Sequence, residues 1–215
     1  HLGKDTMSDF LLDWSALGAD GLFSLFSSGG DSLGVSISTP TSGCNTSFFI
    51  DGNGNLASND VTQATTTILT FDEAVSDVSF SLYDVDAAHG QWDDKVTILA
   101  YDADGNLVPV DFSNVNTSLQ TVNGNTIEGT TNGDTDINGA GDTDTVDVNI
   151  AGPIVRLEII HDNGDSYHES GYISVSDLSF NLADVMGDGI VEGSEGSDII
   201  DGTYLGDPDG DLIDA

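Results

Sequence analysis

The chain of 215 residues carries 38 acidic residues against three basic ones, which gives a formal net charge of −35. This balance excludes nucleic acid and anionic membrane surfaces as direct partners, because binding them depends on Lys and Arg side chains that neutralise phosphates. The single cysteine, Cys44, excludes an intrachain disulfide. No apolar run approaches the ~18 residues of a membrane-spanning segment, so no membrane insertion is expected.

Short runs rich in β-branched and aromatic residues, separated by Gly-rich or polar turns, fill the first third of the chain. They predict strands, because none of them has the apolar period of an amphipathic helix. The expected strands are 10–14, 22–27, 35–40, 47–51 and 65–71.

The clearest pattern lies between Ala74 and Asn106. Residues 78–83 and 96–101 each alternate apolar and polar side chains, which is the period of a strand with one face on a core. We expect these two strands to pair as a long β-hairpin. We expect the loop between them, Asp84–Asp94, to carry function, because functional residues are frequently held by loops on rigid strands.

The second half of the chain continues the same pattern. Further strands are expected at 107–112, 126–129, 146–150, 154–162 and 172–182, with a bulge near Asp177, where the alternation changes phase. Many short strands with turn signals predict an all-β fold, an antiparallel β-sandwich of the jelly-roll type. The absence of alternating helices argues against a parallel α/β sheet. We expect this domain to occupy residues 1–183.

After Asp184 the apolar residues thin out. The segment GSEGSDIID at 193–201 follows the nonapeptide GGxGxDxUx, with serine in place of the second glycine, and a poorer copy begins at Gly206. The tail, residues 184–215, thus resembles the hemolysin-type (RTX) calcium-binding repeats of secreted bacterial proteins. The resemblance implies calcium held between turns of a β-roll, with Asp198 as a ligand, and export from the cell. Because one and a half repeats cannot stack into a roll, we expect an acidic linker or the start of an array.

The strongest candidate calcium site within the sandwich is a loop with the first half of an EF-hand pattern, in which oxygen-bearing side chains stand at positions one, three and five before a glycine at position six. Thr145 stands where the usual bidentate glutamate is expected. Two later aspartates are therefore needed to close the site. The candidate ligands are Asp134, Asp136, Asn138, Asp142 and Asp144. A solvated loop rich in Asx turns is the alternative.

Two other segments repeat this spacing without the glycine at position six. The first has Asp51, Asn53 and Asn55, with Asp60 nearby, and is a second candidate calcium site. The other, Asp102–Asn106, lies in a hairpin turn only long enough to reverse the chain, so a metal site is less expected there.

Two loops hold most of the remaining polar and aromatic side chains. If successive connections reverse the chain direction, both loops lie at one pole of the sandwich, joined by the loops after Asp51 and Gly129. The candidate ligand-binding residues are His89, Gln91, Trp92, Asp93 and Asp94 in one loop, and His161, Asn163, Asp165, Tyr167 and His168 in the other.

Such a pole suits a sugar, because an indole stacks on a pyranose ring while carboxylates, amides and imidazoles bond its hydroxyls. A calcium-binding jelly roll with an aromatic-bearing loop resembles the noncatalytic carbohydrate-binding modules of secreted polysaccharide-degrading enzymes. The resemblance implies an extracellular module of a larger polypeptide. The strong negative charge favours a neutral or weakly charged polysaccharide as partner.

Two alternatives stay open. In the first, Trp92 anchors its own loop and the domain is a structural or adhesive module of an RTX-type surface protein. In the second, the domain is a polysaccharide lyase that uses His161, Tyr167, His168 and Arg156, or a hydrolase that uses paired acids such as Asp93 and Asp94. A lyase site for an anionic polymer needs several cations, however, and the chain has three basic residues.

Overall fold

The computed structural model describes residues 9–17, 22–26, 30, 32–38, 48–59, 64–88, 91–131, 143–164 and 171–183. The chain divides into two compact units, His1–Leu182 and Ala183–Ala215. All described residues except Ala183 belong to the first unit. The RTX-like tail therefore lies outside the described residues, and the boundary after residue 183 stays a prediction.

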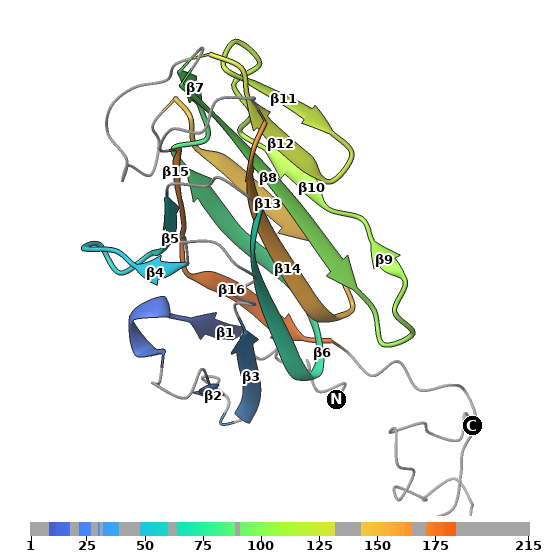
Figure 1. Cartoon of the computed structure of the whole chain (residues 1–215). Helices are drawn as coiled ribbons and strands as arrows, with labels where there is room; N and C mark the ends of the chain where they lie inside the picture. The colour runs from blue at the N-terminus through green and yellow to red at the C-terminus, as the bar shows by residue number, and fades with distance from the viewer. Residues whose placement is uncertain are drawn as a thin grey trace, which may run out of the picture. The chain divides into compact units, whose positions relative to one another are not determined.

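The first unit is built almost entirely of strands (Figure 1). They are β1 Asp9–Leu12, β2 Leu22–Phe26, β3 Ser32–Ser38, β4 Phe49–Ile50, β5 Leu56–Asn59, β6 Thr65–Tyr83, β7 Ala87–Ala88, β8 Trp92–Tyr101, β9 Leu107–Val108, β10 Asp111–Ser113, β11 Gln120–Asn123, β12 Thr126–Gly129, β13 Val146–Ile150, β14 Ile154–Asn163, β15 Tyr172–Val175 and β16 Leu178–Leu182. Among the described residues the only helical segment is a 3-10 turn, η1, at Trp14–Ala16. No described helix has the length and apolarity that crossing a membrane requires.

The strand pairs are all antiparallel and divide into two layers. The first layer runs in the order β11, β12, β8, β14, first half of β6, β3 and β2. In the second layer β10 pairs with β13, and β13 pairs with the second half of β6. The edge of β6 opposite β13 pairs with both β15 and β16. β15 also pairs with β5, and β16 also pairs with β1. The predicted all-β antiparallel sandwich is confirmed.

Strand β6 belongs to both layers, because it is 19 residues long and changes partners along its length. Leu69 pairs with Leu157 of β14, whereas Phe80 pairs with Val148 of β13. The expected strand 65–71 and the expected strand 78–83 are thus one continuous element. Its two halves present their alternate side chains to the same core from opposite sides.

The core lies between the layers and closes at one end around aromatic residues. Phe10 of β1 stacks on Phe180 of β16 with ring centroids 5.8 Å apart, and Phe71 meets the same ring edge-on at 5.3 Å. Trp14 is fully buried, and its indole N–H donates to the carbonyl of Ser176 at 2.7 Å. Burial of such large apolar side chains is the main stabilising contribution to the fold.

The predicted hairpin between residues 78–83 and 96–101 is wrong. The first strand pairs with β13, whereas β8 pairs with β14 and β12 in the other layer. Each strand does bury its alternate apolar side chains, as expected. Alternation shows that a strand faces a core, but it does not distinguish a neighbour in one sheet from a strand in the facing sheet ~10 Å away. The loop that begins at Asp84 therefore crosses between layers.

Two other expectations are refined. The expected strand 107–112 splits, because β9 continues beside β8 whereas β10 crosses to β13. The predicted irregularity near Asp177 is confirmed as a break between β15 and β16 at residues 176–177.

Candidate functional site

One end of the sandwich gathers several chain segments, and we call it the pole: residues 84–88, 91–94, 129–131, 143–145, 161–164 and 171–172. Asn163 pairs with Asp94 across β14 and β8, and the Gly164 amide donates to the Asp93 carbonyl at 2.9 Å. The Ala87 amide donates to the Thr131 carbonyl at 3.1 Å. The described ends of the loop before β8, the loop after β14 and the loop after Gly129 therefore lie at one pole, as predicted. Residues 89–90, 132–142 and 165–170 of these loops lie outside the described residues.

The loop after Asp51 joins them only in part. β4 and β5 form a tight hairpin, and Asp51–Asn55 is its turn. β5 then runs toward the pole, where Asn59 pairs with Tyr172. The Asp51 turn lies at the other end of β5, and it contacts the pole through the bond from the Tyr172 hydroxyl to Asp51 Oδ2 at 3.1 Å. The expected place of this loop is therefore only partly right.

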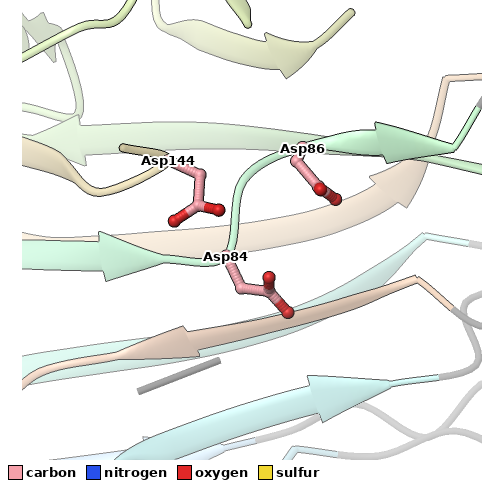
Figure 2. Close-up of side chains that lie close together, drawn as sticks. All are labelled: Asp84, Asp86 and Asp144. Carbon is pink, nitrogen blue, oxygen red and sulfur yellow. The ribbon is translucent and has the colours of Figure 1, made fainter. Parts of the chain in front are cut away.

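Three aspartates at the pole converge on one point (Figure 2). Asp84 and Asp86 follow β6, and Asp144 immediately precedes Thr145 and β13. Their exposed fractions are 8%, 3% and 1%, and one carboxylate oxygen from each lies within 4.8 Å of the others. Asp84 has a positive φ of 62°, an uncommon conformation for a residue with a side chain. The chain is thus turned sharply where the two acids leave the strand.

Buried hydrogen bonds hold the two segments that carry these acids together. The amide nitrogen of Gln120, 2% exposed, donates to the carbonyl of Val85 at 3.0 Å and to the carbonyl of Asp144 at 2.8 Å. The Val85 amide also donates to the Asp144 carbonyl at 3.3 Å, and the Gln120 carbonyl oxygen accepts from the Asn116 amide. Gln120 is a positioning residue that the sequence analysis missed.

Two further contacts close the cluster from the side of β8 and β12. The indole N–H of Trp92 donates to Asp86 Oδ1 at 3.2 Å, and the Asp94 amide donates to the Asp86 carbonyl at 3.0 Å. A side chain at Gly129 would place its Cβ 2.1 Å from the Asp86 carbonyl oxygen. Only glycine therefore allows β12 to approach Asp86 so closely.

Asp94 is a fourth carboxylate beside the cluster. It is 1% exposed, and burial together with the negative charges of Asp86 and Asp144 raises the pKa of its carboxyl group well above the usual range. Its Oδ1 bonds to Nε2 of His161 at 3.1 Å, while its Oδ2 is buried with no hydrogen-bond partner. A buried carboxylate oxygen without a partner is costly unless a cation or water reaches it.

His161 lies on the inner face of β14, 1% exposed. Its Nδ1 lies 3.0 Å from Ser58 Oγ, and burial lowers its pKa to about 3, so the imidazole is neutral near pH 7. A neutral imidazole carries one ring proton, so one of the two nitrogens donates and the other accepts in these bonds to Ser58 and Asp94. These are the residue types of a nucleophilic triad, but Ser58, His161 and Asp94 are each at most 1% exposed and no substrate reaches them.

Arg156 is separated from His161 by the thickness of the first layer. Its guanidinium bonds to Glu158 and lies 5.1 Å from the centre of the Tyr101 ring on the outer face. His161 points inward, because five positions along a strand reverse the direction of the side chain. The described residues of the suggested lyase set therefore do not converge.

The two remaining Asp-rich segments are turns of one kind. Asp51 Oδ1 accepts from the amides of Asn53 and Asn55 at 2.8 and 3.0 Å, and Asp102 Oδ1 accepts from those of Asp104 and Asn106 at 3.0 and 2.7 Å. Each turn has a glycine of positive φ at its fourth position. The spacing that suggested a metal loop instead lets one carboxylate bond the backbone of its own turn.

The second carboxylate oxygen is also used in each turn. Asp51 Oδ2 accepts from the Tyr172 hydroxyl at 3.1 Å, and burial together with the Asp51 charge raises the pKa of Tyr172. Asp102 Oδ2 accepts from the Asn106 amide nitrogen at 3.0 Å, which lowers the pKa of Asp102. In each turn both carboxylate oxygens of the aspartate thus accept hydrogen bonds from the protein, and a metal site at Asp51, Asn53 and Asn55 stays a prediction.

The described part of the chain holds about half of the predicted site residues. Asp144 belongs to the cluster, Trp92 and Asp94 contact its neighbours, Asp93 and Asn163 lie beside it, and Gln91 is exposed at the rim. The predicted residues outside the described part are Asp60, His89, Asp134, Asp136, Asn138, Asp142, Asp165, Tyr167, His168 and Asp198.

The sequence analysis did not name Asp84 and Asp86 as candidate metal-binding residues. The available signal was an Asp-x-Asp pair at the exit of an alternating strand, since residues two apart in an extended segment point to the same side. Nothing in the local sequence indicated that Asp144, far along the chain, would complete the group.

No family model and no curated protein matches the chain. Among solved structures, a low-affinity xylan-binding module (CBM86) from Roseburia intestinalis is 14% identical, covers 69% of this chain and 96% of its own, with a TM-score of 0.33. The K3 adhesin domain of Lys-gingipain from Porphyromonas gingivalis is 10% identical, with coverages of 80% and 98% and a TM-score of 0.39. A family 11 carbohydrate-binding module from Clostridium thermocellum is 14% identical, with coverages of 82% and 97% and a TM-score of 0.28. Similarities this low establish neither a family nor a function.

Proposed function

We propose that this chain is a noncatalytic polysaccharide-binding β-sandwich module, part of a larger secreted protein, whose pole is stabilised by calcium. The observation that carries the proposal is the convergence of Asp84, Asp86 and Asp144, three buried carboxylates with ligand atoms within 4.8 Å of one another.

The cluster fits a hard divalent cation. Calcium binds oxygen atoms at ~2.3–2.6 Å, so two of its ligands can lie up to about 5 Å apart, which is compatible with the spacing here. Two carboxylates 4 Å apart repel each other by ~4 kcal/mol at an effective dielectric of 20. Asp94 beside the cluster has a buried Oδ2 without a hydrogen-bond partner, and burial together with the charges of Asp86 and Asp144 raises the pKa of its carboxyl group. A nearby cation would stabilise the ionised form of this group.

The binding half of the proposal rests on chemistry and charge. The net charge of −35 repels sulfated and uronate polymers over a Debye length of ~8 Å at physiological salt, so a neutral or weakly charged polysaccharide is the favoured ligand. The buried state of Ser58, His161 and Asp94 argues for a module that binds without catalysis.

A structural or adhesive module is the second candidate function. It is favoured by the bond from the Trp92 indole to Asp86, because a tryptophan held in this way packs as an anchor of its loop. In that case calcium would still bind, and polysaccharide would not.

Calcium titration by isothermal calorimetry tests the metal half. We expect one saturable site in the wild type, lost in the variant Asp84→Asn/Asp86→Asn. Asp104→Asn, an exposed turn position, is the matched control and should keep the site. Retention of the calcium heat in the double variant would overturn the assignment to this cluster. Affinity electrophoresis through gels of neutral polysaccharides tests the binding half. If none of these polysaccharides slows the migration of the protein, the structural or adhesive module is the remaining function.

A further inference from the structure

A polar groove crosses the outer face of the second layer, on a part of the molecule the predicted sites do not include. It has a volume of about 420 Å³, and an adjoining hollow of about 310 Å³ shares Ser79 and Asn149 with it. Volumes of this size lie in the range of small-ligand sites in proteins.

The strand register explains why a groove forms here. Two rows of outward side chains cross β10, β13, β6 and the β15–β16 segment, and every member is Ser, Asp or Asn. The first row runs from Ser113 through Asp147 to Ser81, each paired with the next, and the Ser81 amide donates to Ser176 Oγ at 2.9 Å. The second row runs from Asp111 through Asn149 and Ser79 to Ser179, again each paired with the next. Short side chains in adjacent rows leave a hollow above the sheet.

The groove is partly ordered before any ligand arrives. The Ser81 hydroxyl donates to Asp147 Oδ1 at 2.7 Å, and the Asn149 amide nitrogen lies 3.3 Å from Ser113 Oγ, to which it donates. At one end Asp177 is held by the Trp14 amide at 3.0 Å. Hydroxyls and amides can still accept further bonds, and a carboxylate has several acceptor positions. Fixed polar side chains lose less entropy on binding than mobile ones.

The chemistry of the rows selects the ligand. Acceptor oxygens and hydroxyls in two parallel rows match a chain of hydroxyl groups, and charge-assisted bonds to Asp147 strengthen such contacts. The two rows contain no basic side chain, so anionic ligands are repelled. The chain's own tail, residues 184–215, is excluded as an occupant for the same reason, because it holds acidic but no basic residues.

We propose that this groove, rather than the pole, is the surface on which the module binds a neutral polysaccharide. The inference rests on the proposed function and assigns its ligand to a different face. In this proposal calcium at the pole stabilises the fold, and the outer face of the second layer binds the polysaccharide through hydrogen bonds.

The test is affinity electrophoresis in saturating calcium through gels of soluble xylan, mixed-linkage β-glucan, galactomannan and, as an anionic comparison, alginate. Ser79→Ile fills the groove with a strand-compatible side chain, and Asn149→Ala removes its amide. Ser36→Ile, at an exposed position of β3 in the first layer, is the matched control. Thermal melting confirms that each variant folds.

We expect the wild type to bind at least one neutral gel. Ser79→Ile and Asn149→Ala should each weaken that binding about tenfold, the equivalent of ~1.4 kcal/mol, while Ser36→Ile should bind as the wild type does. Amide chemical shifts of the wild type titrated with oligosaccharides of the retarding polymer should move in β13, β6 and β16. If both groove variants bind as strongly as the wild type, the groove is not the binding surface, and the proposed function is unaffected. Absence of wild-type binding to every gel would overturn both.

Discussion

Aspartates occur in two contrasting settings in this domain. In the Asp51 and Asp102 turns the carboxylate is partly or fully exposed and bonds to the backbone of its own five-residue segment. At the pole Asp84, Asp86 and Asp144 are buried and face one another. Hydrogen bonds within each turn stabilise its carboxylate, whereas the cluster brings three carboxylates close together in a buried place.

The comparison teaches that the spacing of acids along the sequence does not show which carboxylates come together in the folded chain. The turn segments have the Asp-x-Asn/Asp-x-Asn spacing of a calcium loop, yet their carboxylates are occupied by hydrogen bonds. The cluster has no such motif and is assembled from two chain segments that Gln120 ties together. Burial and convergence distinguish the two settings, and both are properties of the folded chain.

Removal of calcium should have the largest effect, and it should act on the cluster alone. Calcium at a hundred times its dissociation constant stabilises the folded state by ~2.7 kcal/mol, which for a domain of this size is about 5–10 °C in Tm. Differential scanning calorimetry with calcium and with excess chelator measures this shift. Asp84→Asn/Asp86→Asn should abolish the difference between the two conditions. Equal melting of the wild type in both would refute a structural metal.

A smaller effect is expected from Asp94, measured in chelator by urea unfolding between pH 4 and 8. Its pKa is raised in the folded protein above the unfolded value of ~3.9. Its stabilising contribution is therefore complete below that pH and is lost as the pH rises toward the raised value. Asp94→Asn should gain stability over the wild type as the pH increases.

His161 acts in the opposite direction, because its folded pKa is about 3 and its unfolded value ~6.5, so its contribution is lost as the pH falls through this interval. Asp94 bonds to His161, so the substitution also alters the surroundings of the imidazole. Above the unfolded pKa of His161, ~6.5, the imidazole is neutral in both states and the difference between the two proteins reports on Asp94. A constant difference across the range would show that Asp94 does not titrate as described.

The smallest effect is expected at the Asp102 turn. Hydrogen bonds from Asn106 lower the pKa of Asp102, so its contribution is present above the unfolded pKa of ~3.9 and is lost as the pH falls through the lower folded value. Asp102→Ala should lower Tm slightly at pH 7 and lose this difference near pH 2. Calcium affinity measured by calorimetry should not change. Weaker calcium binding in Asp102→Ala would contradict the assignment of this turn as metal-independent.

Much of the fold follows from local pattern. Residues 78–83, 96–101 and 146–150 alternate in the sequence, and in each case the apolar set is buried. The pairing of these strands did not follow, and the predicted hairpin of residues 78–83 with 96–101 was wrong. The shared pole was predictable from the reversal of strand direction, while the place of the Asp51 turn was predictable only in part, because the short β4 and β5 already reverse the chain.

The sequence by itself determined the class of fold, the inward face of each long strand and the strongly acidic surface, because these depend on the period and the composition of single segments. The tertiary structure decided which strands are neighbours, which acids meet and where small polar side chains form a groove. Asp144 reaches Asp84 and Asp86 only because β13 pairs with β6, and Ser79 lies beside Asn149 for the same reason. Contacts between segments depend on register and layer, which no single segment contains.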